Sequence, residues 1–286
     1  MFVLLGWVGV VVCCFGSYMA MGGKLGVLWQ PFEFTLIFGS GVCAFVVANP
    51  KYMLGKTGKM IGVAMKGPKY TKAHYLELLS LLYAIFKLAK TKGMLAIESH
   101  VERPEESSLF QAFPRFAHDH HALVFLCDYL RLMTLGTDNP HEMESLLDEE
   151  LEVHHTEEVN IATAVQTMAD GLPALGIVAA VMGVIKTMGS ITEPPEVLGK
   201  LIGAALVGTF LGVLLCYGFV GPLASAIKNT IDADAKYLAC IKAGLIAHMS
   251  GYAPAVSVEF ARKALLSHTR PTFYEVEEAV AALPPV

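Results

Sequence analysis

The sequence is short of charged residues, and the shortage is uneven. Asp, Glu, Lys and Arg make up 16% of its 286 residues, whereas about 25% is usual in soluble domains. Residues 1–23 contain no charged side chain, but residues 51–168 carry as much charge as a soluble domain. This distribution excludes an ordinary soluble protein and indicates a membrane protein with a substantial aqueous insert.

Other absences exclude whole classes of function. No P-loop, no GxSxG motif and no GxGxxG motif with a following acid occurs, so nothing indicates an enzyme or a bound cofactor. The net charge of -5 is too small to indicate a nucleic-acid partner, and no nucleic-acid-binding motif is present. The six cysteines form no CxxC pair, which predicts reduced side chains without a disulfide framework.

The histidines raise the question of a metal site. His118, His120 and His121 stand together in HDHH, and His154 and His155 could supply further ligands. Zinc sites commonly use HExxH or paired Cys and His, and neither pattern occurs here. We therefore expect no bound metal, and a membrane metalloenzyme that uses this region is an alternative that metal analysis would test.

Four hydrophobic runs are each close to the ~20 residues that a membrane-spanning helix needs. The first run lacks a basic n-region and a clear cleavage site, so we interpret it as a retained helix rather than a signal peptide. The expected fold is an all-α membrane protein with four transmembrane helices. Its spans are 1–21, 32–49, 169–188 and 201–222, its outer connections 22–31 and 189–200, and its cytoplasmic parts a helical domain, 50–168, and a C-terminal helix and tail, 223–286.

Lysines set the expected orientation, because Lys and Arg near the spans favour the cytoplasmic side. Only Lys24 precedes the second run, whereas six lysines follow it: Lys51, Lys56, Lys59, Lys66, Lys69 and Lys72. The insert, both termini and the tail are therefore predicted to be cytoplasmic.

The insert shows helical periodicity and no strand-like alternation. Residues 70–93 end in Lys90, Lys92 and Gly93, which are signals of a helix C-terminus. A second helix is expected over residues 125–136. A third begins at Asn139-Pro140 and continues without a breaker into the third span, which predicts one long helix leaving the bilayer. The acidic residues at 98–106 and 142–158 are either solvated helix faces or a surface for a charged partner.

The spans have no ionisable residue in their interiors. Glu33, Asp170, Lys186 and Lys200 all lie near span ends. A self-sufficient ion carrier would normally place such a group near the midplane, because buried ionisable residues mark ion pathways.

Small residues occupy one face of each of the last two spans instead. The third span carries Gly176, Ala180 and Gly183, and the fourth carries Ala204, Gly208 and Gly212 beside the polar Thr209. Such stripes allow close helix approach in membranes. They serve either packing within the chain or a surface that lines a channel or holds a partner helix. In the second case the partner would supply the missing carboxylate.

Long motifs resemble the flagellar motor stator family of the MotA type, within the MotA/TolQ/ExbB proton channel family. They are LPALGIVAAVMGVIKTMGS, LIGAALVGTFLGVLLCYGFVGPLA, GGKLGVLWQPFEF, GYAPAVSVEFARKAL and RPTFYEVEE. The resemblance implies a ring of five subunits in the bacterial inner membrane, surrounded by lipid and enclosing a dimer of the partner MotB. MotB would supply the ion-binding aspartate, ion flow would rotate the ring, and the cytoplasmic domain would push on the rotor protein FliG. No cofactor is implied beyond the transported ion.

The resemblance also assigns roles to residues whose motifs match. Thr209, Ala180 and Gly176 are expected on the ion path, and Pro173 and Pro222 couple ion flow to movement, with Asp170 beside them. Ala180 stands where sodium-type relatives tend to have threonine, which favours protons. Lys90, Glu98 and Glu150 are expected to face the rotor, and Lys90 replaces the family's arginine, so the charge is kept but the bidentate fork is lost.

Two further alternatives stay open. A proton-driven energiser of the ExbB/TolQ kind would have three spans, and the additional run at residues 1–21 argues against it. A membrane scaffold without ion flow would need only the packing of small residues, and a proton-leak assay would distinguish it from a channel.

Overall fold

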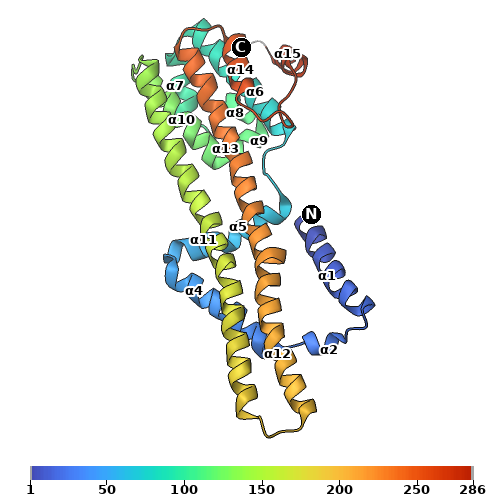
Figure 1. The fold of residues 1–286 in the computed structure, drawn as a ribbon. Helices are drawn as coiled ribbons and strands as arrows, with labels where there is room; N and C mark the ends of the chain where they lie inside the picture. Colours follow the sequence, from blue (N-terminus) through green and yellow to red (C-terminus); the bar gives the residue numbers. More distant parts are fainter. Residues whose placement is uncertain (1, 285–286) are drawn as a thin grey trace. The chain divides into compact units, whose positions relative to one another are not determined.

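The computed structural model describes residues 2–284, and its regular elements in that range are all helical (Figure 1). Two compact units divide the chain: unit 1 takes residues up to Gly67 together with Glu157–Thr230, and unit 2 takes Pro68–Thr156 together with Ile231 onward. Helices α11, Pro140–Gly189, and α13, Gly221–Met249, contribute residues to both units. The predicted all-α fold is confirmed, as is the long uninterrupted helix that begins at Pro140.

Unit 1 contains the apolar helices. Within residues 2–284, four helical stretches are long and apolar enough to cross a membrane: Phe2–Ala20, Leu25–Ala48, α11 and Pro195–Met249. Where the bilayer meets each of them stays a prediction. The elements of unit 1 besides α11 and α13 are α1 Phe2–Ala20, α2 Leu25–Leu28, α3 Pro31–Phe34, the π-helix η1 Thr35–Gly39, α4 Ser40–Ala48, α5 Lys51–Lys66, α12 Pro195–Leu214 and the π-helix η2 Leu215–Val220.

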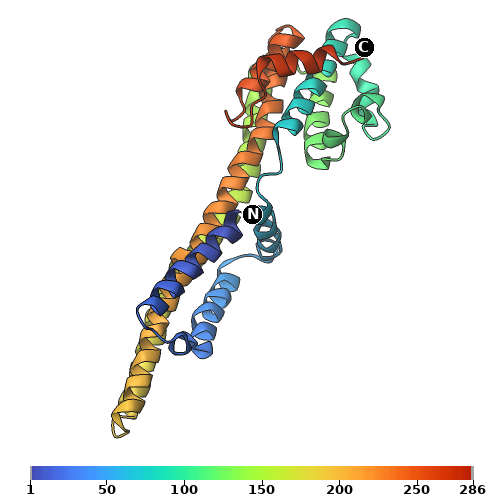
Figure 2. The ribbon, with the colours of Figure 1, turned by 90° about the vertical axis from the view of Figure 1, so that its right-hand side faces the viewer.

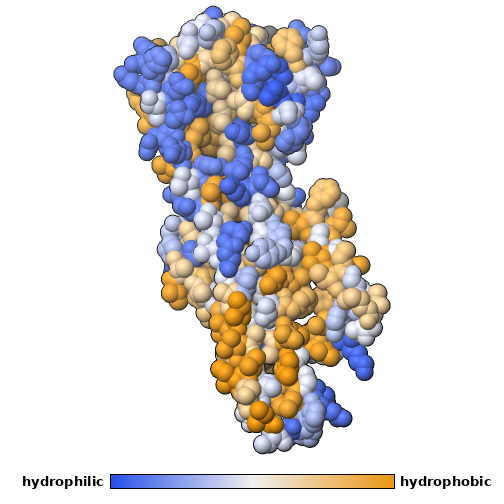
Figure 3. Space-filling model, viewed as in Figure 1, coloured by the Kyte–Doolittle hydropathy of each residue, from blue (hydrophilic) through white to orange (hydrophobic). Residues whose placement is uncertain are grey.

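The buried core of unit 1 is small. One cluster of fully buried residues joins Ile37, Ala169, Leu172, Ala179 and Cys216. Helix α1 has no buried residue, and large apolar side chains such as Leu206, 67% exposed, face outward. Hydrophobic residues consequently cover much of the surface over α11 and α12 (Figure 3). An apolar surface of this extent needs lipid or protein against it.

Unit 2 has a large apolar core built around α6, Lys72–Lys92. The core residues include Leu78, Leu82 and Phe86 of α6 and Tyr237 and Ile241 of α13. The other elements of unit 2 are α7 Leu95–Glu102, α8 Ser108–Gln111, α9 Pro114–Ala117, α10 His120–Thr134, α14 Pro254–Lys263 and α15 Phe273–Ala281. Blue side chains are frequent on its surface in Figure 3, as expected for a domain in water.

Local signals fix the ends of α6. Thr71 and His74 form a capping box at its start, which satisfies backbone donors that the first turn leaves free. Gly93 ends the helix with a φ of 85°, a conformation that glycine adopts without a steric penalty. The helix predicted for residues 70–93 is therefore confirmed.

Helix α10 begins at His120, five residues before the predicted start at residue 125. Asp119 is its N-cap, and the carboxylate accepts a hydrogen bond from the backbone of Ala122. Short aspartate side chains stabilise helix starts in this way. The HDHH motif thus marks the beginning of a helix, a role that the apolar periodicity did not indicate.

The C-terminal helices α14 and α15 pack on α6 (Figure 2). Arg262, 8% exposed, donates to both carboxylate oxygens of Glu259 at 2.6 Å and to the carbonyl of Pro271 at 2.9 Å. Lys72 of α6 donates to Glu275 of α15 at 2.6 Å. The Lys72–Glu275 bond thus links α15 to α6, and Arg262 links α14 to the segment that precedes α15.

Candidate functional site

The small residues of α11 and α12 face each other within one chain. A Cβ added to Gly176 would lie 2.8 Å from the carbonyl oxygen of Gly208 and 3.1 Å from the Cα of Gly212. One added to Gly212 would lie 2.6 Å from the carbonyl oxygen of Leu172. Contacts this short leave no room for a side chain, so glycine is what permits the two backbones to touch.

The same contact continues toward the outer ends of the helices. A Cβ on Gly183 would lie 2.7 Å from the Cβ of Ala205, and one on Gly208 would lie 3.0 Å from that of Ala179. Packing within the chain therefore accounts for the glycines of both stripes, and a surface for a partner helix stays the second interpretation. We call this contact the α11–α12 seam. Gly176 lies in the seam, and its assignment to the ion path stays a prediction.

Pro173 lies inside α11 at a point where three helices meet. Proline has no N–H to give to the carbonyl four residues earlier, which weakens the helix at that turn. The neighbouring Leu172 is fully buried, and glycines approach it from two sides: a Cβ on Gly41 of α4 would lie 2.9 Å from its side chain, and Gly212 of α12 touches its carbonyl. Close packing therefore surrounds the weakened turn.

Pro222 stands at the other weakened point. It is the second residue of α13 and follows directly on the π-helix η2. Because Pro222 cannot donate to the carbonyl of Gly218, the regular α-helical ladder is interrupted there, and a wider π turn is a usual outcome. Both predicted coupling prolines thus stand at irregular or weakened helical turns.

Thr209 faces a hollow in unit 1 and not the seam. The hollow has a volume of about 500 Å³ and is lined by α1 residues Val10 and Cys14 and by α12 and η2 residues that include Phe210 and Tyr217. Other helical threonines, such as Thr187 and Thr230, donate to the carbonyl four residues before them. No hydrogen bond is found for the Thr209 hydroxyl within residues 2–284. Its polar group is therefore free in an apolar hollow.

Glu33 was expected near the end of the second span, and the structure places its carboxylate against Gly208 of α12. The carboxylate oxygen Oε2 is buried without a hydrogen-bond partner in the described part of the chain, and a Cβ on Gly208 would lie 3.3 Å from it. Gly208 directly precedes Thr209, and the backbone nitrogen of Ala180 would lie 3.3 Å from the same added Cβ. The structure thus brings Glu33 and Ala180 against Gly208, whereas the next residue, Thr209, faces the hollow beside α1.

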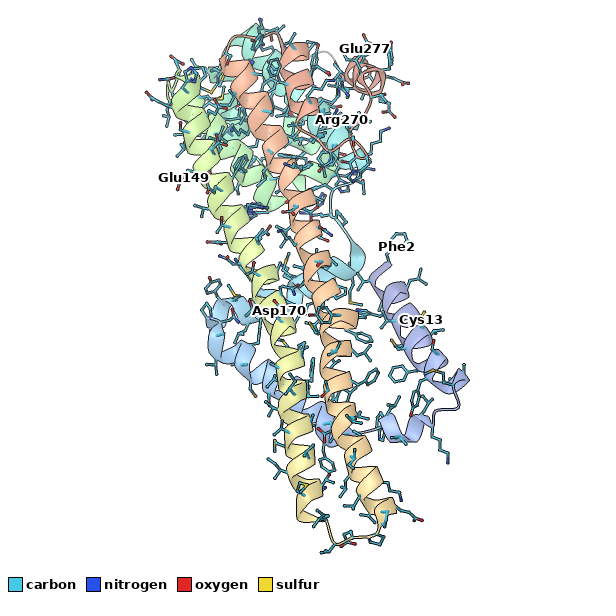
Figure 4. The ribbon with its side chains drawn as sticks, in the orientation of Figure 1. Phe2, Cys13, Glu149, Asp170, Arg270 and Glu277 are labelled. Atoms are coloured by element: carbon cyan, nitrogen blue, oxygen red, sulfur yellow. The ribbon has the colours of Figure 1, made fainter. Side chains whose placement is uncertain are left out.

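Asp170 is exposed on α11, one turn before Pro173 (Figure 4). Its carboxylate accepts a hydrogen bond from Gln166 at 2.7 Å. A polar side chain therefore lies one turn from Pro173. The role of Asp170 in coupling stays a prediction.

The residues expected to face the rotor lie in unit 2. Lys90, in the last turn of α6, and Glu98, in the first turn of α7, lie on either side of the Gly93 turn, and both are exposed. Glu150 lies on α11 and accepts a hydrogen bond from Tyr129 of α10 at 2.6 Å. Burial and this bond together raise the pKa of Tyr129. Glu150 therefore has a structural contact, whatever it binds outside the chain.

The histidines are dispersed among structural contacts. The rings of His121 and His154 stack with centroids 4.5 Å apart, and His155 lies 3.4 Å from the carboxylate of Asp232. No group of three or more possible metal ligands gathers anywhere in residues 2–284.

Two family models match the chain. The one described as "Motility protein A N-terminal" matches residues 4–93, and the one described as "MotA/TolQ/ExbB proton channel family" matches residues 118–239. Neither describes a family of enzymes. Motility protein A of Escherichia coli is 44% identical over 283 residues, which are 99% of this chain and 96% of that protein.

Two solved structures share the fold. The structure of C. jejuni MotAB matches with a TM-score of 0.77 and 17% identity, over 94% of this chain and 98% of the solved one. The flagellar MotAB stator complex of Bacillus subtilis matches with a TM-score of 0.72 and 23% identity, over 96% and 98%. These likenesses establish the fold. The 44% identity across nearly the whole sequence establishes the family: the chain belongs to the motility protein A family.

Proposed function

We propose that this chain is the stator subunit of a bacterial flagellar motor, and that with MotB it forms an ion channel whose current is converted into torque. The observation that carries the proposal is the identity to motility protein A over almost the full length of both chains. The two solved relatives are MotAB complexes. The same partnership gives this chain the carboxylate that its spans lack, as an aspartate on a MotB dimer.

The proposed ion path passes Glu33, Ala180 and Thr209. A proton reaches the half-buried Glu33 carboxylate from outside and passes to a MotB aspartate near the free Thr209 hydroxyl. The ion is a proton because the Ala180 methyl group offers no oxygen ligand, whereas a dehydrated Na⁺ needs several oxygen ligands. The transported ion is cargo, and the chain works without a resident cofactor.

Coupling is proposed to use the two prolines. Neutralising the partner's aspartate changes its interaction with the apolar surface of α11 and α12. The turns at Pro173 and Pro222 lack one backbone hydrogen bond each, so they bend at a lower energy than the rest of the helices. The subunit lies in the inner membrane in a ring of five, its termini are cytoplasmic, and Lys90, Glu98 and Glu150 act on the rotor protein FliG.

Swimming speed tests the proposal. Cells without their own stator genes would carry this chain with its MotB, and external Na⁺ would be varied at fixed pH before a protonophore is added. We expect restored swimming that ignores Na⁺ and stops with the protonophore. Speed that rises with Na⁺ would overturn proton coupling. Absent swimming, with restored proton-driven transport across the outer membrane, would favour the ExbB/TolQ alternative.

A further inference from the structure

A largely apolar hollow in unit 2 is lined by none of the residues assigned to ion flow or to the rotor. It has a volume of about 430 Å³ and is lined by α11, by α13 with the turn that follows it, and by Phe260 in the second half of α14. Tyr252 and Phe260 stack over it with ring centroids 5.1 Å apart, and they are 46% and 49% exposed. Its floor is aliphatic, formed by Leu151, Ala239, Ala243, Ile246 and Ala247. Two large aromatic rings therefore stand open to solvent above an apolar floor.

A row of carboxylates borders the hollow on the α11 side. Glu144 and Asp148 line it, and Glu152 continues the row one turn further, because residues four apart lie on one helix face. Lys242, across the hollow, lies 2.5 Å from Asp148 and 3.7 Å from Glu144. One lysine cannot neutralise the whole row, and Glu152 has no ion pair within residues 2–284. Like charges four apart destabilise a helix by a few tenths of a kcal/mol; Lys242 compensates for this at Glu144 and Asp148, whereas nothing of the kind compensates for it at Glu152.

We propose that this hollow binds a cationic amphipathic peptide segment of a partner protein. Apolar side chains of the segment would enter against Tyr252 and Phe260, and its Lys or Arg side chains would meet Glu144, Asp148 and Glu152. Unit 2 holds more Asp and Glu than Lys and Arg, so a second copy of unit 2 would bring like charge, which disfavours it as the occupant.

The site is separate from the proposed rotor contact. Glu150 turns toward Tyr129 of α10, away from the hollow between α11 and α13. The binding also requires no ion flow, so its test is independent of the swimming test.

The probe is a fluorescein-labelled amphipathic helix of Leu and Lys, about 15 residues long so that it can form a helix on binding. Fluorescence anisotropy would follow its binding to the full-length chain in phosphatidylcholine nanodiscs, with empty nanodiscs as the background. The same peptide with Glu in place of Lys tests the sign of charge. We expect only the Lys peptide to bind, with an affinity that falls as the salt concentration rises.

Two matched pairs of variants locate the site. Glu152→Gln is compared with Glu149→Gln, which removes an equally unpaired carboxylate of α11 outside the row (Figure 4). Phe260→Ala is compared with Phe273→Ala in α15, where Phe273 is 52% exposed and also contacts a tyrosine ring. We expect affinity to fall about threefold for Glu152→Gln and about tenfold for Phe260→Ala, and less than about twofold for the controls.

Three results would overturn the proposal. Equal losses in Glu149→Gln and Glu152→Gln would mean that the peptide senses general charge alone. Unchanged affinity in Phe260→Ala would mean that the peptide does not use the hollow. If Phe260→Ala loses helical circular dichroism, Phe260→Leu is measured in its place. A change in particle mass in Phe260→Ala would place a second copy of the chain there.

Discussion

At the scale of single residues, the Thr209 hydroxyl can be tested almost in isolation. Valine keeps the branched shape of threonine and replaces the hydroxyl with a methyl group, so the polar group is lost at similar volume. We expect Thr209→Val to lower both proton uptake into vesicles and swimming speed by about tenfold, equivalent to about 1.4 kcal/mol in the barrier. Thr209→Ser is the control, because it keeps the hydroxyl. Normal speed in Thr209→Val would remove this group from the ion path.

Asp119 shows how one buried carboxylate organises unit 2. It is 6% exposed and accepts hydrogen bonds from Lys69 at 2.7 Å and from the Tyr70 hydroxyl at 2.6 Å. Burial raises the pKa of this carboxyl, but the bonds from Lys69 and Tyr70 outweigh burial, so the pKa lies below its ordinary value of 3.8. Its stabilising effect is therefore complete above the unfolded pKa and is lost as pH falls through the lower, folded pKa.

We accordingly predict that Asp119→Asn lowers the stability of unit 2 by about 1–3 kcal/mol at neutral pH, since the lysine and tyrosine lose a charged acceptor. Below pH 4 the difference in unfolding free energy between Asp119→Asn and the unmodified chain should become smaller. The unmodified chain then loses the stabilisation that the ionised Asp119 gives it. Amide hydrogen exchange of α6 and α10 in the full-length chain measures this. Asp128→Asn, which alters an exposed acid of α10, should have little effect, and an equal effect of both variants would contradict the prediction.

At the scale of elements, the α11–α12 seam predicts opposite effects for two glycines of one helix. Gly212→Ala would place a methyl group 2.6 Å from the carbonyl oxygen of Leu172 and 2.9 Å from the Cα of Gly176. Both contacts are with backbone atoms, so the helices must separate. Gly199→Ala meets nothing within 4 Å and should stabilise α12 by about 0.5–1 kcal/mol. Thermal unfolding in detergent should show a lower midpoint for the first variant and an unchanged or higher one for the second; the same shift in both would contradict the seam.

The π-helix η2 gives a second prediction at this scale. Pro222→Ala restores a backbone N–H that can donate to the carbonyl of Gly218. We expect residues 215–222 to become regular α-helix, with slower amide exchange, and swimming speed to fall while the protein still assembles. Slower exchange with normal swimming would show that the irregular turn is not needed for coupling.

Elements were predictable where their signals are local. Residues within one helical turn determine where α6 starts and ends, at Thr71 and Gly93. The same holds for the start of α11 at Asn139-Pro140, so these signals can be read directly from the sequence. The start of α10 was not predicted, because Asp119 is placed by Lys69 and Tyr70, which lie 50 and 49 residues away. The small-residue stripes were recognised, but a stripe states only that something approaches closely, and it does not say which helix. For the same reason Glu33 could be placed near a span end but not against Gly208.

At the scale of the whole molecule, the chain leaves too much apolar surface uncovered to function alone. Helix α1 buries none of its residues, and Val181 of α11 and Leu206 of α12 are 52% and 67% exposed. A closed ring of identical subunits uses two different surfaces of each copy, one against each neighbour. The exposed faces of α11 and α12 could serve as these two surfaces. The α11–α12 seam could not, because the two helices of one chain already fill it.

Cysteine cross-linking tests whether these faces meet in a ring. Cys13 and Cys43 are exposed and Cys14 is half-buried, so all three would first be replaced by alanine. If α11 of one copy lies against α12 of the next, Val181→Cys with Leu206→Cys should give a ladder of oxidised products in membranes that ends at five chains. Ala169→Cys with Leu206→Cys is the control, because Ala169 is fully buried within one chain, and it should give no ladder. A ladder that stops at two would indicate a symmetric pair, in which each copy uses one surface twice, and would contradict the ring.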